Sequence, residues 1–185
     1  MALLTRPLYA VPAALLLAVI ITGVVMMVNR SGQSSMFEIT SASYVNFQAV
    51  VKGDLKLSLA TSDTSELKRF FKEAGVTFDV FFPQMAAELK GGVVSHHGDK
   101  HYAHLVYGVG AHTVYLFEVD QPSITNGRVS LADNVGEDVR KSHWHWEERD
   151  GIGTLFVWKS NTIMCSAVSD LRTQDFSALF RLETL

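Results

Sequence analysis

The chain has 185 residues, a formal net charge of -3 and 48% hydrophobic residues. Its 16 lysine and arginine residues stand against 19 acidic ones, so there is no basic footprint for nucleic acid or for extended contact with anionic lipid. The one cysteine, Cys165, excludes an internal disulfide framework, a four-cysteine zinc site and a CxxCH haem attachment. Its apolar surroundings predict a small core residue.

An uncharged, almost wholly apolar stretch occupies residues 8–28. At 1.5 Å per residue, a helix of that length matches a hydrocarbon core roughly 30 Å thick. The sequence therefore predicts one membrane-spanning helix in contact with the lipid bilayer. Residues 1–7 form a short head before the span, so we expect the work of the protein to be done by the part that follows it.

The predicted span resembles an uncleaved signal anchor more than a cleaved signal peptide. A cleaved signal has an apolar stretch of about 7 to 15 residues and small residues at its cleavage site, and residues 26–30 (MMVNR) offer no such pair. Arg6 and Arg30 nearly balance across the span, so charge gives little orientation. We expect a cytoplasmic N-terminus and a periplasmic C-terminal domain at the bacterial inner membrane, because signal anchors usually carry a translocated domain.

The residues after the span suggest a tether and then the start of a folded domain. Residues 29–43 are rich in serine and glycine, which predicts a flexible tether. A short helix is expected near residues 44–52, and the alternation in residues 55–59 predicts a half-buried strand. Asp63 and Glu66 have the spacing of a capping box before an amphipathic helix, which Gly75 is placed to end.

From residue 77 onward the apolar pattern has the period of strands. We expect strands at residues 77–82, 93–96, 101–107, 112–119, 143–149, 154–158 and 162–168, with a helical turn at 84–90 and a last helix from about 173 to 181. Residues 120–141 are predicted to be a long surface insertion. The fold class that follows is α+β: one antiparallel sheet, with amphipathic helices on one face, over residues 44–185.

Three segments together resemble the extracytoplasmic half of transmembrane anti-sigma factors of the bacterial zinc-finger type. They are residues 62–80, residues 88–117 with the motifs ELKGG, YAHLVY and HTVYLF, and residues 156–171 with the closing helix. The resemblance covers residues 57–182 and implies a similar α+β fold. Members of that family hold a sigma factor with a cytoplasmic zinc domain, where this sequence has residues 1–7. The resemblance therefore implies the fold without the sigma-binding activity.

Histidines are the candidates for a metal or pH-sensing site. His96, His97, His101 and His104 suggest a metal site only on a helix, and in a strand context His101 and His104 point to opposite faces. His143 and His145 are expected to share one strand face, with Trp144 and Trp146 on the other. They are weak metal candidates because no carboxylate or cysteine lies beside them at a ligand spacing.

No nucleophile motif, Walker loop or dinucleotide fingerprint is present in the sequence, so we expect no enzyme activity, no cofactor and no small-molecule substrate. The leading hypothesis is a single-pass accessory subunit of a larger bacterial membrane complex, respiratory or photosynthetic, whose partners are other membrane protein subunits. The alternative is an anti-sigma-factor-like envelope sensor that acts through a partner. The residues expected to contact a partner are Ala14, Ala18 and Gly23 in the span, Tyr44 and Phe47 near the membrane, and Asp133 and Asn134 in the insertion.

Overall fold

The computed structural model describes residues 36–180. The predicted head, the predicted span and residues 29–35 of the predicted tether lie outside that range, and so do Ala14, Ala18 and Gly23. Among residues 36–180, no helix combines the length and the apolar character that crossing a bilayer requires.

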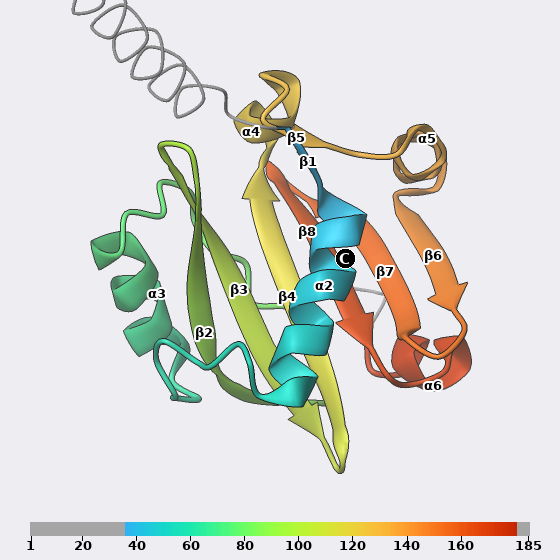
Figure 1. The fold of residues 1–185 in the computed structure, drawn as a ribbon, viewed down its shortest axis with the longest axis horizontal. Coiled ribbons are helices and arrows are strands. Elements are labelled where there is room, and N and C mark those ends of the chain that lie inside the picture. Colours follow the sequence, from blue (N-terminus) through green and yellow to red (C-terminus); the bar gives the residue numbers. More distant parts are fainter. Residues whose placement is uncertain (1–35, 181–185) are drawn as a thin grey trace, which may run out of the picture. The chain divides into compact units, whose positions relative to one another are not determined.

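Six antiparallel strands form one sheet in the order β2-β3-β4-β8-β7-β6 (Figure 1). The strands β2, β3 and β4 follow one another as hairpins, and so do β6, β7 and β8. The two halves join where β4 pairs with β8, and Phe117 lies opposite Ser166 there. The predicted α+β class and antiparallel sheet are confirmed. The strand bounds are Glu88–His97 (β2), Lys100–Val109 (β3), His112–Asp120 (β4), Trp144–Arg149 (β6), Gly153–Ser160 (β7) and Ile163–Ser169 (β8).

Both faces of the sheet are covered, whereas the sequence predicted helices on one face only. One side, here called the α2 face, packs the helices α2 (Ile39–Lys52) and α5 (Asp133–Ser142) against alternate strand residues. The other side, the α3 face, packs α3 (Thr64–Glu73) and α6 (Thr173–Ser177) against the remaining ones. Strands such as β8 are buried along their whole length, because a sheet covered twice has apolar residues at consecutive positions.

The amphipathic helix predicted between Asp63 and Gly75 is confirmed as α3. Asp63 is its N-cap, and its carboxylate accepts hydrogen bonds from the backbone N–H groups of Ser65 and Glu66. Glu66 does not return the bond of a full capping box, because its carboxylate accepts from the Thr61 hydroxyl at 2.7 Å. Leu67 and Phe71 are buried on the α3 face, as their spacing predicts.

The folded unit begins at Met36, earlier than the predicted end of the tether at residue 43. The strand β1 (Phe37–Glu38) is followed directly by α2, so the helix starts five residues before the predicted position. Serine and threonine favour caps and turns, which made residues 40–43 look like linker. Here Ser43 is instead buried, and its hydroxyl bonds the carbonyl of Ile39 at 2.8 Å and the hydroxyl of Ser166 at 2.7 Å.

Three predicted elements before β2 are wrong. Residues 55–59 make one isolated bridge, Leu59 to Gly92, and no strand. Residues 77–82 form no strand either, because they cross the α3 face and pack Val80 and neighbouring phenylalanines onto it. Residues 84–90 are not a helical turn, since Met85 bridges Phe180 and β2 begins at Glu88.

The segment predicted as a surface insertion, 120–141, is part of the folded core. It contains α4 (Gln121–Thr125), the two-residue strand β5 (Val129–Ser130) and most of α5. β5 pairs in parallel with β1, and Val129, Val135 and Val139 are buried on the α2 face. This segment therefore holds the N-terminal end of the domain in place.

The C-terminal part of the domain agrees better with the sequence. α6 is shorter than predicted, but Phe176, Leu179 and Phe180 are buried together on the α3 face. Cys165 is fully buried in the core, as predicted, and burial raises the pKa of its thiol well above the usual value, with the nearby Glu118 carboxylate adding to the effect.

Candidate functional site

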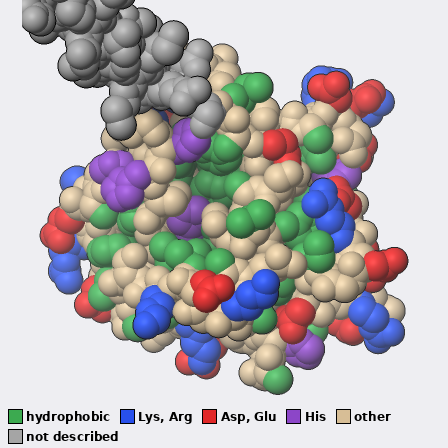
Figure 2. Space-filling view, in the orientation of Figure 1, with side chains coloured by type: hydrophobic (Ala, Val, Ile, Leu, Met, Phe, Trp, Pro, Cys, Tyr) green, Lys and Arg blue, Asp and Glu red, His purple; other side chains and the backbone are tan. Residues whose placement is uncertain are grey.

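A groove of about 400 Å³ runs between the start of α2 and the end of β2. On the α2 face, Figure 2 shows hydrophobic side chains reaching the surface among histidines. Two separate stretches of chain build the groove, because β1 and α2 pack beside β2 and β4. The lining residues are Phe37, Glu38, Ser41, Ala42, Val45 and Asn46 from the first stretch, with Ser95, His96, His97 and Phe117 from the sheet.

The floor of the groove is aromatic. The ring of Phe37 stacks on that of Phe117 with centroids 5.8 Å apart and an interplanar angle of 13°. Phe37 also meets the ring of His97 edge-on at 4.6 Å and that of Tyr102 at 5.7 Å. These contacts fix Phe37 as a rigid apolar surface at the very beginning of the folded unit.

Glu38 holds this surface in place as the N-cap of α2. Its two carboxylate oxygens accept hydrogen bonds from the N–H groups of Thr40, at 2.9 Å, and Ser41, at 2.7 Å, and from the Thr40 hydroxyl. Burial by itself raises the pKa of this carboxyl, but the hydrogen bonds from Thr40 and Ser41 outweigh it and hold the pKa below its usual value.

Replacing Glu38 by Ala is expected to lower the free energy of unfolding by about 1 kcal/mol, because two helix N–H groups lose their acceptor. Urea unfolding followed by tryptophan fluorescence measures this. The variant Glu73→Ala removes a carboxylate from an exposed position of α3 and serves as the matched control. An equal loss in both variants would mean that the cap does not hold α2.

A buried polar network lies beneath the groove. The imidazole of His104 bonds the Ser95 hydroxyl through Nε2 at 2.6 Å and the Tyr115 hydroxyl through Nδ1. Asn46 in turn hydrogen-bonds the Tyr115 phenol. The proton arrangement in which the Asn46 amide donates to Tyr115, Tyr115 donates to Nδ1 and Nε2–H donates to Ser95 satisfies all four groups, and it agrees with the lowering effect of the Asn46 hydrogen bond on the pKa of Tyr115. Because Asn46 and Ser95 both line the groove, the network ties its two walls together.

Burial sets the charge of this network. Full burial lowers the pKa of His104 to about 3, and it raises the pKa of Tyr115 against the opposing effect of the Asn46 hydrogen bond. Both groups are therefore neutral at physiological pH. The network makes the groove rigid and uncharged at its base, which suits recognition of an apolar surface.

Two large apolar side chains are exposed in or next to the segments that build the groove. Val45 is 65% exposed and Met36 is 62% exposed. Val45 lines the groove, and Met36 directly precedes Phe37. Apolar groups grouped around a groove are typical of a surface that another molecule covers.

Tyr44 and Phe47, predicted as contact residues, are instead core residues that are each 3% exposed. With α2 starting at Ile39, they continue the helix stripe that faces the sheet, and Val45 occupies the outer side. Tyr44 packs its ring against the guanidinium of Arg149, 4.3 Å from the ring centroid. Burial raises its pKa, the Glu147 carboxylate adds to that, and Arg149 opposes it.

His143 and His145 do not share a strand face as predicted. His143 has the left-handed φ of 73° and ends α5, before β6 begins. His145 is 8% exposed, and its Nδ1 lies 2.7 Å from Asp138 Oδ2. Trp144 is 40% exposed, while Trp146 stacks on Phe156 at 3.9 Å. Within residues 36–180, no three histidine, cysteine or acidic side chains gather in a way that suits a metal ion.

Asp133 and Asn134 are exposed in the first turn of α5, away from the residues that line the groove. Their role in partner contact stays a prediction. Among the earlier histidine candidates, His101 bonds the Ala74 carbonyl at 2.5 Å and His104 is buried on the α2 face, so the two do point to opposite sides of β3. The groove itself was not predicted, because it joins residues far apart in sequence.

A buried carboxyl lies on the opposite face of the sheet. Glu118 is fully buried, and its Oε2 accepts a hydrogen bond from the Phe81 N–H at 2.9 Å. Its other oxygen has no hydrogen-bond partner in the part of the chain that the structure describes. Burial raises the pKa of this carboxyl well above its usual value, against the Phe81 hydrogen bond, so burial favours its protonated form.

Comparison of the chain with protein-family models, with curated protein sequences and with solved structures found no match. The groove and the buried groups around it are therefore interpreted from their own chemistry.

Proposed function

We propose that the protein is a non-enzymatic, single-pass accessory subunit of a bacterial membrane complex, and that its groove between α2 and β2 docks on a partner membrane subunit. The observation that carries the proposal is the exposed side chain of Val45 beside the aromatic floor of Phe37 and Phe117, with the exposed Met36 directly before Phe37 in the chain. A respiratory or photosynthetic complex is the proposed class of assembly, with the domain on the periplasmic side of the inner membrane.

Chain length supports a partner in the same membrane. Residues 29–35 separate the predicted span from Met36, and an extended chain covers at most about 3.5 Å per residue. A span at residues 8–28 would therefore keep Met36 within roughly 30 Å of the bilayer surface. The groove begins at Phe37, so only a partner that projects a short way from the membrane needs to reach it.

The chemistry of the groove favours binding over catalysis. Three groups with strongly displaced pKa values, His104, Glu118 and Cys165, are all fully buried, and none of them lines the groove. Glu38 does line it, but its carboxylate is committed to capping α2. An apolar floor with fixed polar neighbours resembles a recognition surface.

Replacing Val45 by Asp is expected to lower recovery of the partner at least about tenfold, because a charge would be buried in an apolar contact. The measurement is purification of the tagged full chain from native membranes in mild detergent, with quantification of co-migrating subunits. Val51→Asp is the matched control: Val51 is 56% exposed on the same helix but does not line the groove.

Stoichiometric co-migration of the native chain and the Val51 variant with one large complex, and its loss in the Val45 variant, supports the proposal. A chain that runs as a free monomer, or two variants that lose the partner equally, would overturn docking through the groove.

A further inference from the structure

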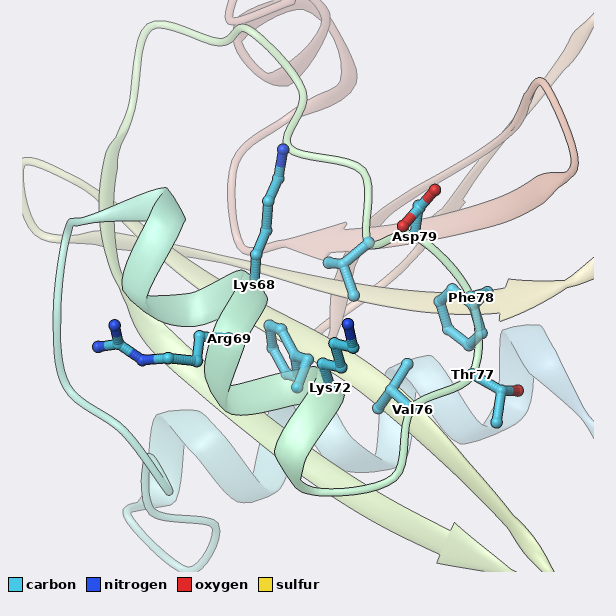
Figure 3. A pocket seen from close by; sticks show the side chains of 9 residues that line it. Lys68, Arg69, Lys72, Val76, Thr77, Phe78 and Asp79 are labelled. Atoms are coloured by element: carbon cyan, nitrogen blue, oxygen red, sulfur yellow. The ribbon is translucent and has the colours of Figure 1, made fainter.

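We propose that a second hollow, between α3 and residues 76–80, binds an amphipathic anion: a carboxylate, phosphate or sulfonate head on an apolar body. This hollow has a volume of about 810 Å³, large enough for a lipid-sized or aromatic acid. Figure 3 shows the segment 76–80 curving past the helix with the hollow between them. The proposal concerns a different surface from the docking groove and does not depend on it.

One wall of the hollow is cationic. Lys68, Arg69 and Lys72 all come from α3, and Lys68 and Lys72 lie four residues apart. In Figure 3, the side chains of Lys68 and Lys72 extend along the gap, while Arg69 points away from it. Within residues 36–180, no carboxylate forms an ion pair with any of the three.

The remaining walls are mostly apolar. Phe71, Val76 and Val80 are buried members of the α3-face core, and Phe78 packs partly against it. The single acidic lining residue, Asp79, lies across the hollow from α3 in Figure 3. An anionic head is therefore expected beside Lys68 and Lys72, with its apolar body directed along the partly exposed ring of Phe78.

A basic helix face is usually just solvated, and two features distinguish this one. Lys68 and Lys72 are like charges at a spacing where they repel each other, and a bound anion relieves that repulsion. They also stand, exposed, at the edge of a hollow with apolar residues among its lining, so an anion with an apolar body has a second surface to contact there. A head group alone would only relieve the repulsion between the two lysines, whereas an amphipathic anion would also fill the hollow beside them.

The test uses the full chain in nanodiscs of phosphatidylcholine and a photoreactive octanoate that carries a diazirine. Peptide mapping after illumination is expected to place most labelling within residues 68–80, and unlabelled octanoate is expected to compete it away. The neutral diazirine alcohol of the same length is expected to label this segment at least about fivefold less, because it lacks the charge contact with two lysines.

Substitutions distinguish binding in the hollow from nonspecific binding of the probe. Lys68→Gln with Lys72→Gln is expected to reduce labelling about fivefold, and the Lys68→Arg, Lys72→Arg chain is expected to retain it. Lys56→Gln with Lys159→Gln removes the same charge outside the hollow and is expected to change nothing. Labelling spread along the chain, or labelling that survives the Gln pair, would overturn the proposal.

The same assay identifies the source of the anion. Discs that contain phosphatidylglycerol displace the probe from residues 68–80 if the site takes a lipid head group, and leave labelling unchanged if it takes a free acid. Binding of the chain to anionic discs that depends on Lys68 and Lys72 without any octanoate labelling would overturn the hollow as the site.

Discussion

Replacing His104 by Gln is expected to protect the fold against acid. An unfolded histidine titrates near 6.5, whereas the buried imidazole has a pKa of about 3. Below pH 6.5 the unfolded chain therefore binds a proton that the folded chain does not, and stability falls as the pH falls. The native chain should lose about 5 kcal/mol from this group between pH 6.5 and 3, and the Gln variant should not.

The measurement is the free energy of unfolding of the full chain in mild detergent at several pH values, followed by tryptophan fluorescence. Gln keeps a donor for Ser95 and an acceptor for Tyr115, so the network need not be broken. His96→Gln, at an exposed position on β2, is the control and should leave the acid slope as it is. Equal acid slopes in the native and His104→Gln chains would show that the imidazole is not held neutral.

Replacing Glu118 by Gln is expected to protect the fold at high pH. An unfolded glutamate titrates near 4.5, and the folded pKa is raised well above that by burial. Above pH 4.5 the folded chain therefore holds a proton that the unfolded chain has lost, so stability falls as the pH rises. The native chain should lose about 1.4 kcal/mol per pH unit until the buried carboxyl ionises.

Gln at position 118 retains an oxygen for the Phe81 N–H and has no proton to lose. The free energy of unfolding of the Gln variant minus that of the native chain should therefore grow as the pH rises above 4.5, whatever the difference is at pH 4. Glu73→Gln on the exposed side of α3 controls for loss of a carboxylate and should leave the slope unchanged. A pH-independent difference between the native and Glu118→Gln chains would contradict a buried, protonated carboxyl.

The two groups together shape the pH profile of stability. From pH 4.5 upward their contributions have opposite slopes of similar size, and they cancel for as long as the buried Glu118 carboxyl keeps its proton and the unfolded histidine is still protonated. Stability should fall below pH 4.5 because of His104, and the loss that Glu118 causes should grow with pH until the buried carboxyl ionises. One group lies on each face of the sheet, so each variant should remove one side of the profile only.

The six strands of the large sheet, β2, β3, β4, β6, β7 and β8, were predictable because their signal is local. Alternation within residues 101–119 and turn residues such as Gly110 and Asn161, which have left-handed φ values of 57° and 52°, mark the hairpins directly. The helix α3 carries its cap and its apolar stripe within a single window. For these elements, the interactions that decide the structure lie a few residues apart.

The failures have a different origin. The start of α2 depends on β5, because Phe37, just before the helix, pairs with Val129, about ninety residues later in the chain. Without that distant partner, the serine-rich sequence indicated a tether. Residues 77–82 have a strand-like apolar pattern, but they cover a sheet face instead of joining the sheet. The groove was not visible in the sequence because Phe37 meets Phe117 only after the sheet has formed.

Docking through the groove is tested most directly by crosslinking in the native membrane. A photoreactive phenylalanine at position 45 should crosslink the full chain to one membrane subunit, while the same residue at position 51 should give little or none. Crosslinking to a single subunit from position 45 alone is the predicted result. Equal crosslinking from both positions, or none from position 45, would contradict the proposed docking site.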